Sequence, residues 1–179
     1  MNKIKFIVLG LDKVGKTTII FQLFENIFND KLLPTVGDDK SLKEIEINHK
    51  KVKIEICDTP GAKIFSTANK IFMRNSKIAL IVYDITDERS FEELNYWIKE
   101  VKEINKNEEL IIGIAANKCD LYEYQEVSFG EGVKFAKDNN CLFYITSAKD
   151  HDSIENAFEG LTRAYIEQIE RKKKNILNN

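Results

Sequence analysis

The sequence is poor in several residue types and lacks long apolar runs. Its three cysteines include no C-x-x-C pair, and the chain begins without a signal peptide, so we expect reduced thiols in a cytosolic compartment. It has only two prolines, and its composition is otherwise ordinary for a soluble globular protein, with 43% hydrophobic and 31% charged residues. No apolar run approaches the roughly 18 residues that a membrane-spanning helix needs. With 27 basic and 29 acidic residues, the chain lacks the positive charge of a dedicated nucleic-acid binder.

Signals for lipid attachment are also missing. The chain begins Met-Asn rather than Met-Gly and ends without a terminal cysteine, so neither myristoylation nor prenylation is indicated. The basic run at residues 171–174 fits an anionic membrane surface or, equally well, a solvated helix end. Either the chain is truncated before an anchor or it works without a lipid of its own, and we expect a cytoplasmic protein that reaches a membrane peripherally, through its partners.

The apolar residues predict a parallel sheet. A length of 179 residues suits one compact domain. Four apolar runs without polar alternation, at residues 4–9, 78–83, 110–116 and 142–146, indicate strands that are covered on both faces. Segments with helical periodicity lie between them.

A fifth segment, residues 51–56, alternates strictly and follows the β-prone residues 42–47 after a short polar link. We expect these two segments to form an antiparallel hairpin at the sheet edge. The whole pattern predicts an α/β fold of doubly wound type, with about six mostly parallel strands. The domain is expected to span residues 1–170, with a basic, disordered tail at residues 171–179.

Two helix starts are predicted from capping residues. Ser90 and Glu93 have the spacing of a capping box in front of one amphipathic helix. Asp152 or Ser153 is the predicted N-cap of the final helix.

Residues 10–17 (GLDKVGKT) match the phosphate-loop pattern G-x-x-x-x-G-K-[ST] and directly follow the first predicted strand. The glycines allow the backbone to wrap a phosphate, while successive N–H groups and the next helix start supply a positive field. In this pattern Lys16 reaches the β- and γ-phosphates, and the Thr17 hydroxyl binds Mg²⁺. The alternative, an incidental glycine turn, does not explain the placement between strand and helix.

Two further motifs predict the base. Asn117-Lys118-Cys119-Asp120 follows the third parallel run, and Thr146-Ser147-Ala148-Lys149 ends the fourth, where such sheets bind ligands. The Asp120 carboxylate can accept both guanine N1–H and the exocyclic amine, a pattern that adenine lacks. We expect Asn117 at the base edge, the Lys118 stem on the ring face, and Ser147 orienting Asp120. Alone, N-K-x-D is also compatible with a polar turn; behind a phosphate loop it predicts guanine.

These motifs, in this order and spacing, resemble the Ras superfamily of small GTPases over residues 3–170. Residues 81–91 (IVYDITDERSF) look most like the Rab branch, whereas the phosphate loop and residues 34–37 (PTVG) look like the Arf branch. The resemblance implies a P-loop NTPase G domain that acts as a monomeric GTP/GDP switch in membrane traffic or signalling. The loops around Thr35 and Gly61, switch I and switch II, would respond to the third phosphate and contact exchange factors, activating proteins and effectors.

The resemblance also implies individual roles. Phe28 packs against the guanine, and Thr35 binds Mg²⁺ and the γ-phosphate in the GTP state. Asp58 holds Mg²⁺ through water, and Gly61 offers its N–H to the γ-phosphate. Lys16, Thr35 and Gly61 then surround the reacting phosphate as catalytic residues. The implied nucleotide-binding residues are Asp12, Lys13, Val14, Gly15, Lys16, Thr17, Thr18, Phe28, Thr35, Gly61, Asn117, Lys118, Asp120, Ser147, Ala148 and Lys149, and the metal ligands are Thr17, Thr35 and Asp58.

This chain departs from the family at the catalytic step. Ala62 follows DTPG where many relatives carry a glutamine that orients the attacking water. Asp12 would crowd the space that an activating protein's arginine enters. We therefore expect slow hydrolysis of GTP to GDP and phosphate. Leu32, where a tyrosine often covers the nucleotide, and Cys57, a tryptophan in Rab-like chains, argue against borrowing a known effector.

Other readings remain open at this stage. Ala62 and Asp12 are compatible with a non-hydrolysing, GTP-dependent scaffold. Alternatively, the protein is an active enzyme in which other groups orient the attacking water and Ala62 has no effect on the rate. A P-loop kinase fits less well, because the guanine motifs occupy the later strand ends. Lys13 aligns with an asparagine that helps bind a monovalent cation in some GTPases that read DTPG plus an apolar residue. Its ammonium can supply that charge in cis, or Lys13 is simply a solvated loop lysine.

Overall fold

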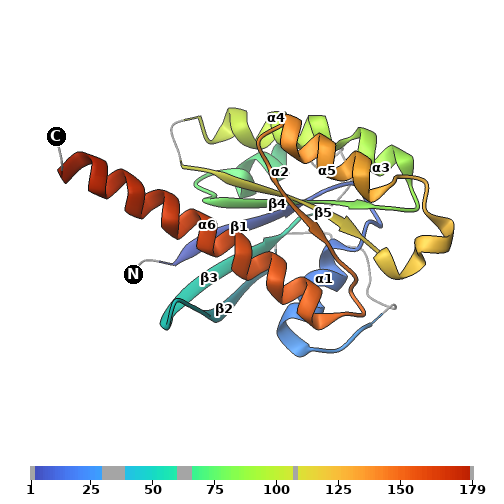
Figure 1. The fold of residues 1–179 in the computed structure, drawn as a ribbon, viewed down its shortest axis with the longest axis horizontal. Helices are drawn as coiled ribbons and strands as arrows, with labels where there is room; N and C mark the ends of the chain where they lie inside the picture. The colour runs from blue at the N-terminus through green and yellow to red at the C-terminus, as the bar shows by residue number, and fades with distance from the viewer. Residues whose placement is uncertain (1–2, 30–38, 60–65, 107–108, 178–179) are drawn as a thin grey trace.

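The computed structural model describes residues 3–29, 39–59, 66–106 and 109–177, and it confirms the predicted fold class (Figure 1). Six strands form one sheet in the order β2-β3-β1-β4-β5-β6. In the described residues, β2 and β3 pair antiparallel as the edge hairpin, and the other four strand pairs are parallel. The strands are β1 (Ile4–Leu9), β2 (Asp39–Ile47), β3 (Lys50–Asp58), β4 (Ile78–Asp84), β5 (Ile111–Asn117) and β6 (Leu142–Ile145).

Helices cover both faces of the sheet (Figure 1). One face packs on α1 (Lys16–Glu25) and α6 (His151–Leu177). The other packs on α2 (Ser66–Met73), α3 (Glu88–Glu92), α4 (Leu94–Ile104) and α5 (Phe129–Asp138), and a 3₁₀ helix, η2 (Cys119–Tyr124), follows β5.

Alternate side chains of β1 supply the two cores. Phe6 enters the core under α6, where its ring centroid lies 5.2 Å from that of Phe158. Ile7 enters the opposite core, which also contains Trp97 of α4. All three aromatic rings are almost completely buried, and burial of a large apolar side chain contributes about 1.5–3 kcal/mol. A strand such as β1, which carries apolar side chains on both faces, is therefore stable only between two helical layers.

The prediction of two covered faces is wrong for the last strand. β1, β4 and β5 are buried as expected, but in β6 Leu142 and Ile145 are 40% and 44% exposed. Among the described strands, β6 pairs with β5 alone and is therefore an edge strand. Its apolar residues do not distinguish an edge from an interior position.

The predicted capping box at Ser90 and Glu93 is wrong. Ser90 lies inside α3, whose N-cap is Asp87; the Asp87 side chain accepts a hydrogen bond from the Arg89 N–H at 3.1 Å. The Ser90 hydroxyl donates instead to the carbonyl of Asp87 at 2.7 Å and accepts from the Asp84 N–H at 2.9 Å. Ser90 therefore ties the helix start to the end of β4.

The start and end of α6 also differ from the prediction. The helix begins at His151, and the Asp150 carboxylate accepts from the Ser153 N–H, so neither predicted N-cap is the capping residue. Its C-terminal part includes residues 171–177, for which the sequence predicts disorder. An ion pair between Lys172 and Glu109, 2.7 Å apart, connects this part to the domain. No helix of the described residues is long and apolar enough to cross a membrane.

Candidate nucleotide-binding site

The phosphate loop occupies the turn between β1 and α1, and close approach of neighbouring atoms requires both of its glycines. Gly10 has φ +141°, and a Cβ there would lie 2.2 Å from the carbonyl oxygen of Val82. Gly15 has φ +97°, and a Cβ there would lie 2.5 Å from Nδ2 of Asn117. Both backbone conformations disfavour L side chains. The loop can therefore approach β4 and β5 closely, with the N-terminus of α1 beside it.

Lys16, the first residue of α1, is a buried cation. Its side chain is 5% exposed, and its ammonium donates to the carbonyl of Leu11 at 2.9 Å. Burial lowers the pKa of Lys16 to about 8, although the carboxylates of Asp58 and Asp12 favour the charged form. A neighbouring anion would favour the protonated ammonium. A polyphosphate in the loop would supply that anion.

Thr17 and Asp58 meet at the ends of α1 and β3. The Thr17 hydroxyl donates to Asp58 Oδ2 at 2.6 Å, and Asp58 is 3% exposed. Thr59 fixes this corner, because its hydroxyl donates to the Val8 carbonyl at 2.6 Å and its N–H to Asp58 Oδ1 at 3.0 Å. Two hard oxygen atoms therefore lie together at the mouth of the phosphate loop, which suits Mg²⁺ chemically.

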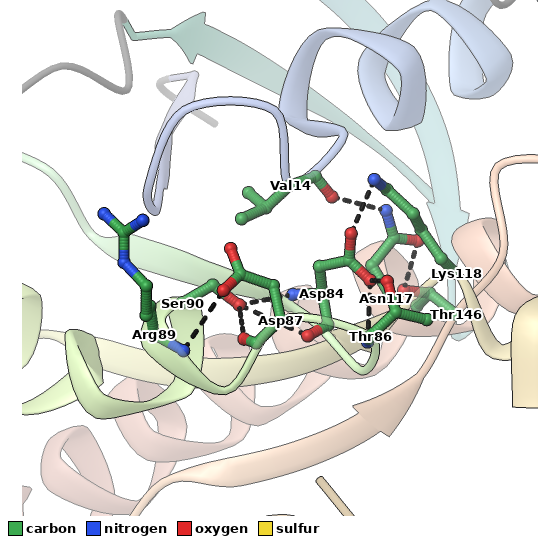
Figure 2. Close-up of polar contacts among 9 residues, drawn as sticks. All are labelled: Val14, Asp84, Thr86, Asp87, Arg89, Ser90, Asn117, Lys118 and Thr146. Atoms are coloured by element: carbon green, nitrogen blue, oxygen red, sulfur yellow. Dashed lines mark hydrogen bonds and ion pairs between the residues drawn. The ribbon is translucent and has the colours of Figure 1, made fainter. Parts of the chain in front are cut away.

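Asn117, at the end of β5, joins the phosphate loop to β6. Its Nδ2 donates to the carbonyl of Val14 at 2.8 Å, and its Oδ1 accepts from the Thr146 hydroxyl at 3.1 Å (Figure 2). The residue is 1% exposed. The sequence predicts Asn117 at the base edge; in the structure its amide also connects the end of β5 to the phosphate loop and to the residue that follows β6. Each polar atom of the amide retains capacity for one further bond.

Asp120 lies between Ser147 and Lys149, at the ends of neighbouring strands. The Ser147 hydroxyl donates to Asp120 Oδ1 at 2.6 Å, and the Lys149 ammonium is 2.8 Å from Oδ2. Partial burial opposes ionisation of Asp120, but hydrogen bonds from Lys149 and Ser147 outweigh it, so the pKa of the carboxyl lies below its ordinary value. The carboxylate is therefore ionised and acceptor-only at neutral pH.

Lys118, in the same motif, pairs with Asp84, a residue outside the predicted site. Its backbone is in the left-handed region, with φ +62°, and its ammonium lies 2.6 Å from Oδ2 of Asp84 (Figure 2). Asp84 ends β4 and is opposite Asn117 in the sheet register. Its other oxygen accepts from the N–H and hydroxyl of Thr86, at 2.9 and 2.8 Å. The D-x-T turn after an apolar run was the signal available in the sequence.

The remaining described site residues lie around this cluster. Asp12 and Lys13 are exposed on the loop, and Lys13 has φ +65°. Phe28 is 41% exposed, and the Lys149 ammonium lies 5.5 Å from its ring centroid. Thr18 is half-buried in α1, and Ala148 is buried. Thr35, Gly61 and Ala62, together with Leu32, lie outside the described residues.

The structure thus brings the phosphate-loop and base motifs together at the carboxyl ends of β1, β4, β5 and β6. Figure 2 shows how hydrogen bonds connect Asn117 to the loop at Val14 and to Thr146, and how an ion pair connects Asp84 to Lys118, the residue after Asn117. Within the described ranges, no group of three or more His, Cys, Asp and Glu side chains could hold a metal ion. A site of this kind would hold a cation with few protein ligands and the phosphates themselves.

Comparison with known proteins agrees with this arrangement. The family model described as "Ras family" matches residues 5–167. The chain is 34% identical over 175 residues to the Ras-related protein RabQ of Dictyostelium discoideum, covering 98% of this chain and 85% of the relative. It is 36% identical over 170 residues to human Ras-related protein Rab-8B, covering 94% and 81%. With Ras-related protein Rab-13 of Canis lupus familiaris it shares 34% identity over 161 residues, covering 89% and 78%.

Proposed function

Because this chain belongs to the Ras family and is a Rab-like small GTPase, we propose that it binds GTP and GDP at the described site and hydrolyses GTP slowly. The observation that best supports guanine is the ionised Asp120 carboxylate, held by Ser147 and Lys149 at a strand end beside the phosphate loop. An ionised carboxylate can accept the two donors of guanine, whereas adenine would present an acceptor to it. In this proposal the base replaces part of the contact between Lys149 and Asp120.

The phosphates would bind along the loop N–H groups, with Lys16 turning from the Leu11 carbonyl to the β- and γ-phosphate oxygens. Thr17 and Asp58 fit Mg²⁺, since their oxygens already meet at 2.6 Å. The ion supplies charge neutralisation for the phosphate oxygens when it is bound. Thr35 and Gly61 are proposed to complete this end of the site, as the two switch segments of a partner-binding surface for effectors and regulators.

Slow hydrolysis is the finer part of the proposal. Ala62 has no polar side-chain atom with which to orient water, so catalysis would rest on Lys16 and the loop N–H groups. Lys13 is exposed on the phosphate loop, as a solvated lysine would be. It is also part of the loop along which the phosphates would bind. If Lys13 stabilises the transition state in cis, Lys13→Ala lowers the single-turnover rate of GTP hydrolysis. An unchanged rate identifies it as a solvated loop residue.

The scaffold alternative has a separate test. Phosphate release from GTP-loaded protein, measured at high protein concentration, should exceed the buffer blank if the protein is an enzyme. Release equal to the blank, with GTP still bound, would show a GTP-dependent scaffold. We also propose that the protein acts in membrane traffic and reaches membranes through its partners, a proposal that its Rab-like family membership supports.

The base assignment is tested by Asp120→Asn. An amide at this position can donate to the C2 carbonyl of xanthine, whereas guanine presents an amine there. We expect the affinity for GDP to fall by about 100-fold or more, since two hydrogen bonds to a charged group are affected, and the affinity for xanthosine diphosphate to rise. Asp138→Asn, at the exposed end of α5, is the matched control. Equal GDP affinity in the Asp120 variant and wild type would refute guanine recognition by Asp120.

A further inference from the structure

A groove of about 450 Å³ lies at the N-terminal ends of β1 and β4, the opposite ends of these strands from the phosphate loop. Its walls are the start of β1, the turn between β2 and β3, and the C-terminal half of α6. Figure 1 shows the N-terminal end of the chain and the outer part of α6 together at this end of the sheet. The volume lies within the range of about 300–1,000 Å³ that is typical of ligand sites. None of the nucleotide-site residues lines it, so it is a separate surface.

The groove has an apolar floor. Ile4, Ile47 and Val52 form the part contributed by the sheet, and each is at most 3% exposed. Ile166 and Ile169 of α6 form the opposite wall and are only half-buried. The helix wall can therefore bury further apolar surface, which stabilises binding by about 25 cal/mol per Å² of apolar area.

The groove has a basic rim. Lys3, Lys50, Lys77 and Lys173 line it, against a single acidic residue, Glu170. In the described part of the chain, neither Lys50 nor Lys173 takes part in an ion pair, whereas Lys3 pairs with Glu55 at 2.5 Å. The whole chain carries a net charge of −2, so this positive charge is concentrated locally.

The helix wall of the groove continues outward as an amphipathic face. From Ile166, residues at intervals of three, seven and ten positions fall on one side of α6, and they are Ile169, Lys173 and Ile176. Ile176 and its neighbour Leu177 are 76% and 84% exposed. Apolar residues flanked by lysines on a helix that projects beyond the sheet are the pattern of an interfacial helix (Figure 1).

We propose that this groove and the outer face of α6 bind anionic phospholipids of a membrane surface. The lysine rim contacts the headgroups, and the half-buried wall at Ile166 and Ile169 and the outer face of α6 contact the acyl chains. A second copy of the chain would present the same lysines to the rim, and this like-charge contact argues against a dimer. The inference does not rest on nucleotide binding, because the two surfaces share no residue.

Co-sedimentation with vesicles tests the charge requirement. We expect the protein to bind vesicles that contain phosphatidylserine and not vesicles of phosphatidylcholine alone. Lys50→Glu with Lys173→Glu should lower the affinity at least about 25-fold, since each lysine at an anionic surface contributes about fivefold. Lys99→Glu with Lys137→Glu makes the same charge change on exposed helical positions outside the groove, and should lower it much less. Equal losses in the two double variants would overturn the proposal.

Fluorescence of an introduced tryptophan tests the apolar contact. The native Trp97 is buried in the core on the other face of the sheet and provides a constant background. With Ile169→Trp we expect quenching by phospholipids brominated in their acyl chains. Quenching of Ile176→Trp but not of Ile169→Trp would show that the helix end alone contacts lipid and would overturn the role of the groove.

A folding control accompanies both experiments. GDP affinity and the unfolding midpoint of each variant should match wild type, because the groove is remote from the phosphate loop. Failure of folded, GDP-bound wild-type protein to bind phosphatidylserine vesicles would contradict the proposal. Concentration-dependent dimerisation that is abolished by the Lys50 and Lys173 changes would also contradict it.

Discussion

The Lys118 ammonium lies 2.6 Å from the carboxylate of Asp84, a 6%-exposed residue at the end of the neighbouring strand. Asp84 is itself held by the N–H and hydroxyl of Thr86, and its backbone is tied to Ser90 (Figure 2). A charge-assisted contact to a well-fixed partner restricts a flexible lysine. Asp84 is therefore positioned to hold the Lys118 side chain along the base site, although it would not contact the base itself.

Asp84→Asn is expected to speed GDP release roughly tenfold. The amide preserves the acceptor for Thr86 but loses the charge that holds Lys118, and a hydrogen bond to a charged group contributes about 1.5–3 kcal/mol. Stopped-flow release of fluorescent GDP measures the rate. Asp87→Asn, which keeps a cap acceptor for Arg89, is the control. A lower thermal unfolding midpoint without a change in the rate of GDP release would assign Asp84 a structural role only.

Gly15→Ala should destabilise the nucleotide-free protein by about 2–4 kcal/mol. Its Cβ would meet the Asn117 amide at 2.5 Å in a left-handed backbone, which adds strain and breaks the bond to Val14. Gly130→Ala is the matched change, because a Cβ there meets nothing closer than Ser128 Oγ at 3.9 Å. That variant should gain up to about 1 kcal/mol, since alanine favours the helix. Denaturant unfolding compares the two, and equal effects would contradict the geometry.

Lys16 predicts a specific pH dependence of stability without nucleotide. Its folded pKa of about 8 lies below the ordinary 10.5, so between these pH values the unfolded chain binds more protons. Stability should therefore rise with pH in this window, by up to about 3 kcal/mol from this group. The free energy of unfolding of wild type relative to Lys16→Met isolates the contribution. A difference that stays flat from pH 7 to 10.5 would contradict the burial cost.

Nucleotide binding should reverse this effect. Phosphates beside Lys16 favour its charged form, so GDP binding near pH 8.5 is expected to take up protons. Calorimetry in two buffers of different ionisation enthalpy measures the uptake, and it should vanish near pH 7, where Lys16 is already charged. Proton release at pH 8.5 would contradict a polyphosphate at Lys16.

Ala62→Gln should raise the single-turnover rate of GTP hydrolysis by roughly tenfold or more, because an amide is then available to orient water. Ala62→Leu supplies comparable bulk without a polar group and should leave the rate unchanged. Equal rates in wild type and the glutamine variant would mean that other groups already aim the water.

The fold could be predicted from sequence because its signals are local. Apolar runs such as residues 4–9 and the alternation at 51–56 indicate strands and their covering, and the phosphate loop shows where β1 meets α1. β6 could not be recognised as an edge strand, because its neighbour is set by sheet order rather than by its own residues.

Site contacts between residues far apart in the sequence were harder to predict than the motifs themselves. Ser147 beside Asp120 follows from two recognised motifs. The pair of Asp84 and Lys118 does not, because it depends on the register that places Asp84 opposite Asn117. Ser90 shows the same limit: its spacing suits a cap, yet its hydroxyl bonds the end of β4.

The nucleotide released from the purified protein tests the central claim most directly. Protein isolated with Mg²⁺ throughout is denatured, and the released nucleotide is identified and quantified by chromatography against the protein. We predict close to one guanine nucleotide per chain, as GDP or GTP. Adenine nucleotide in that place, or a folded protein that neither retains nor rebinds guanine nucleotide, would contradict the account.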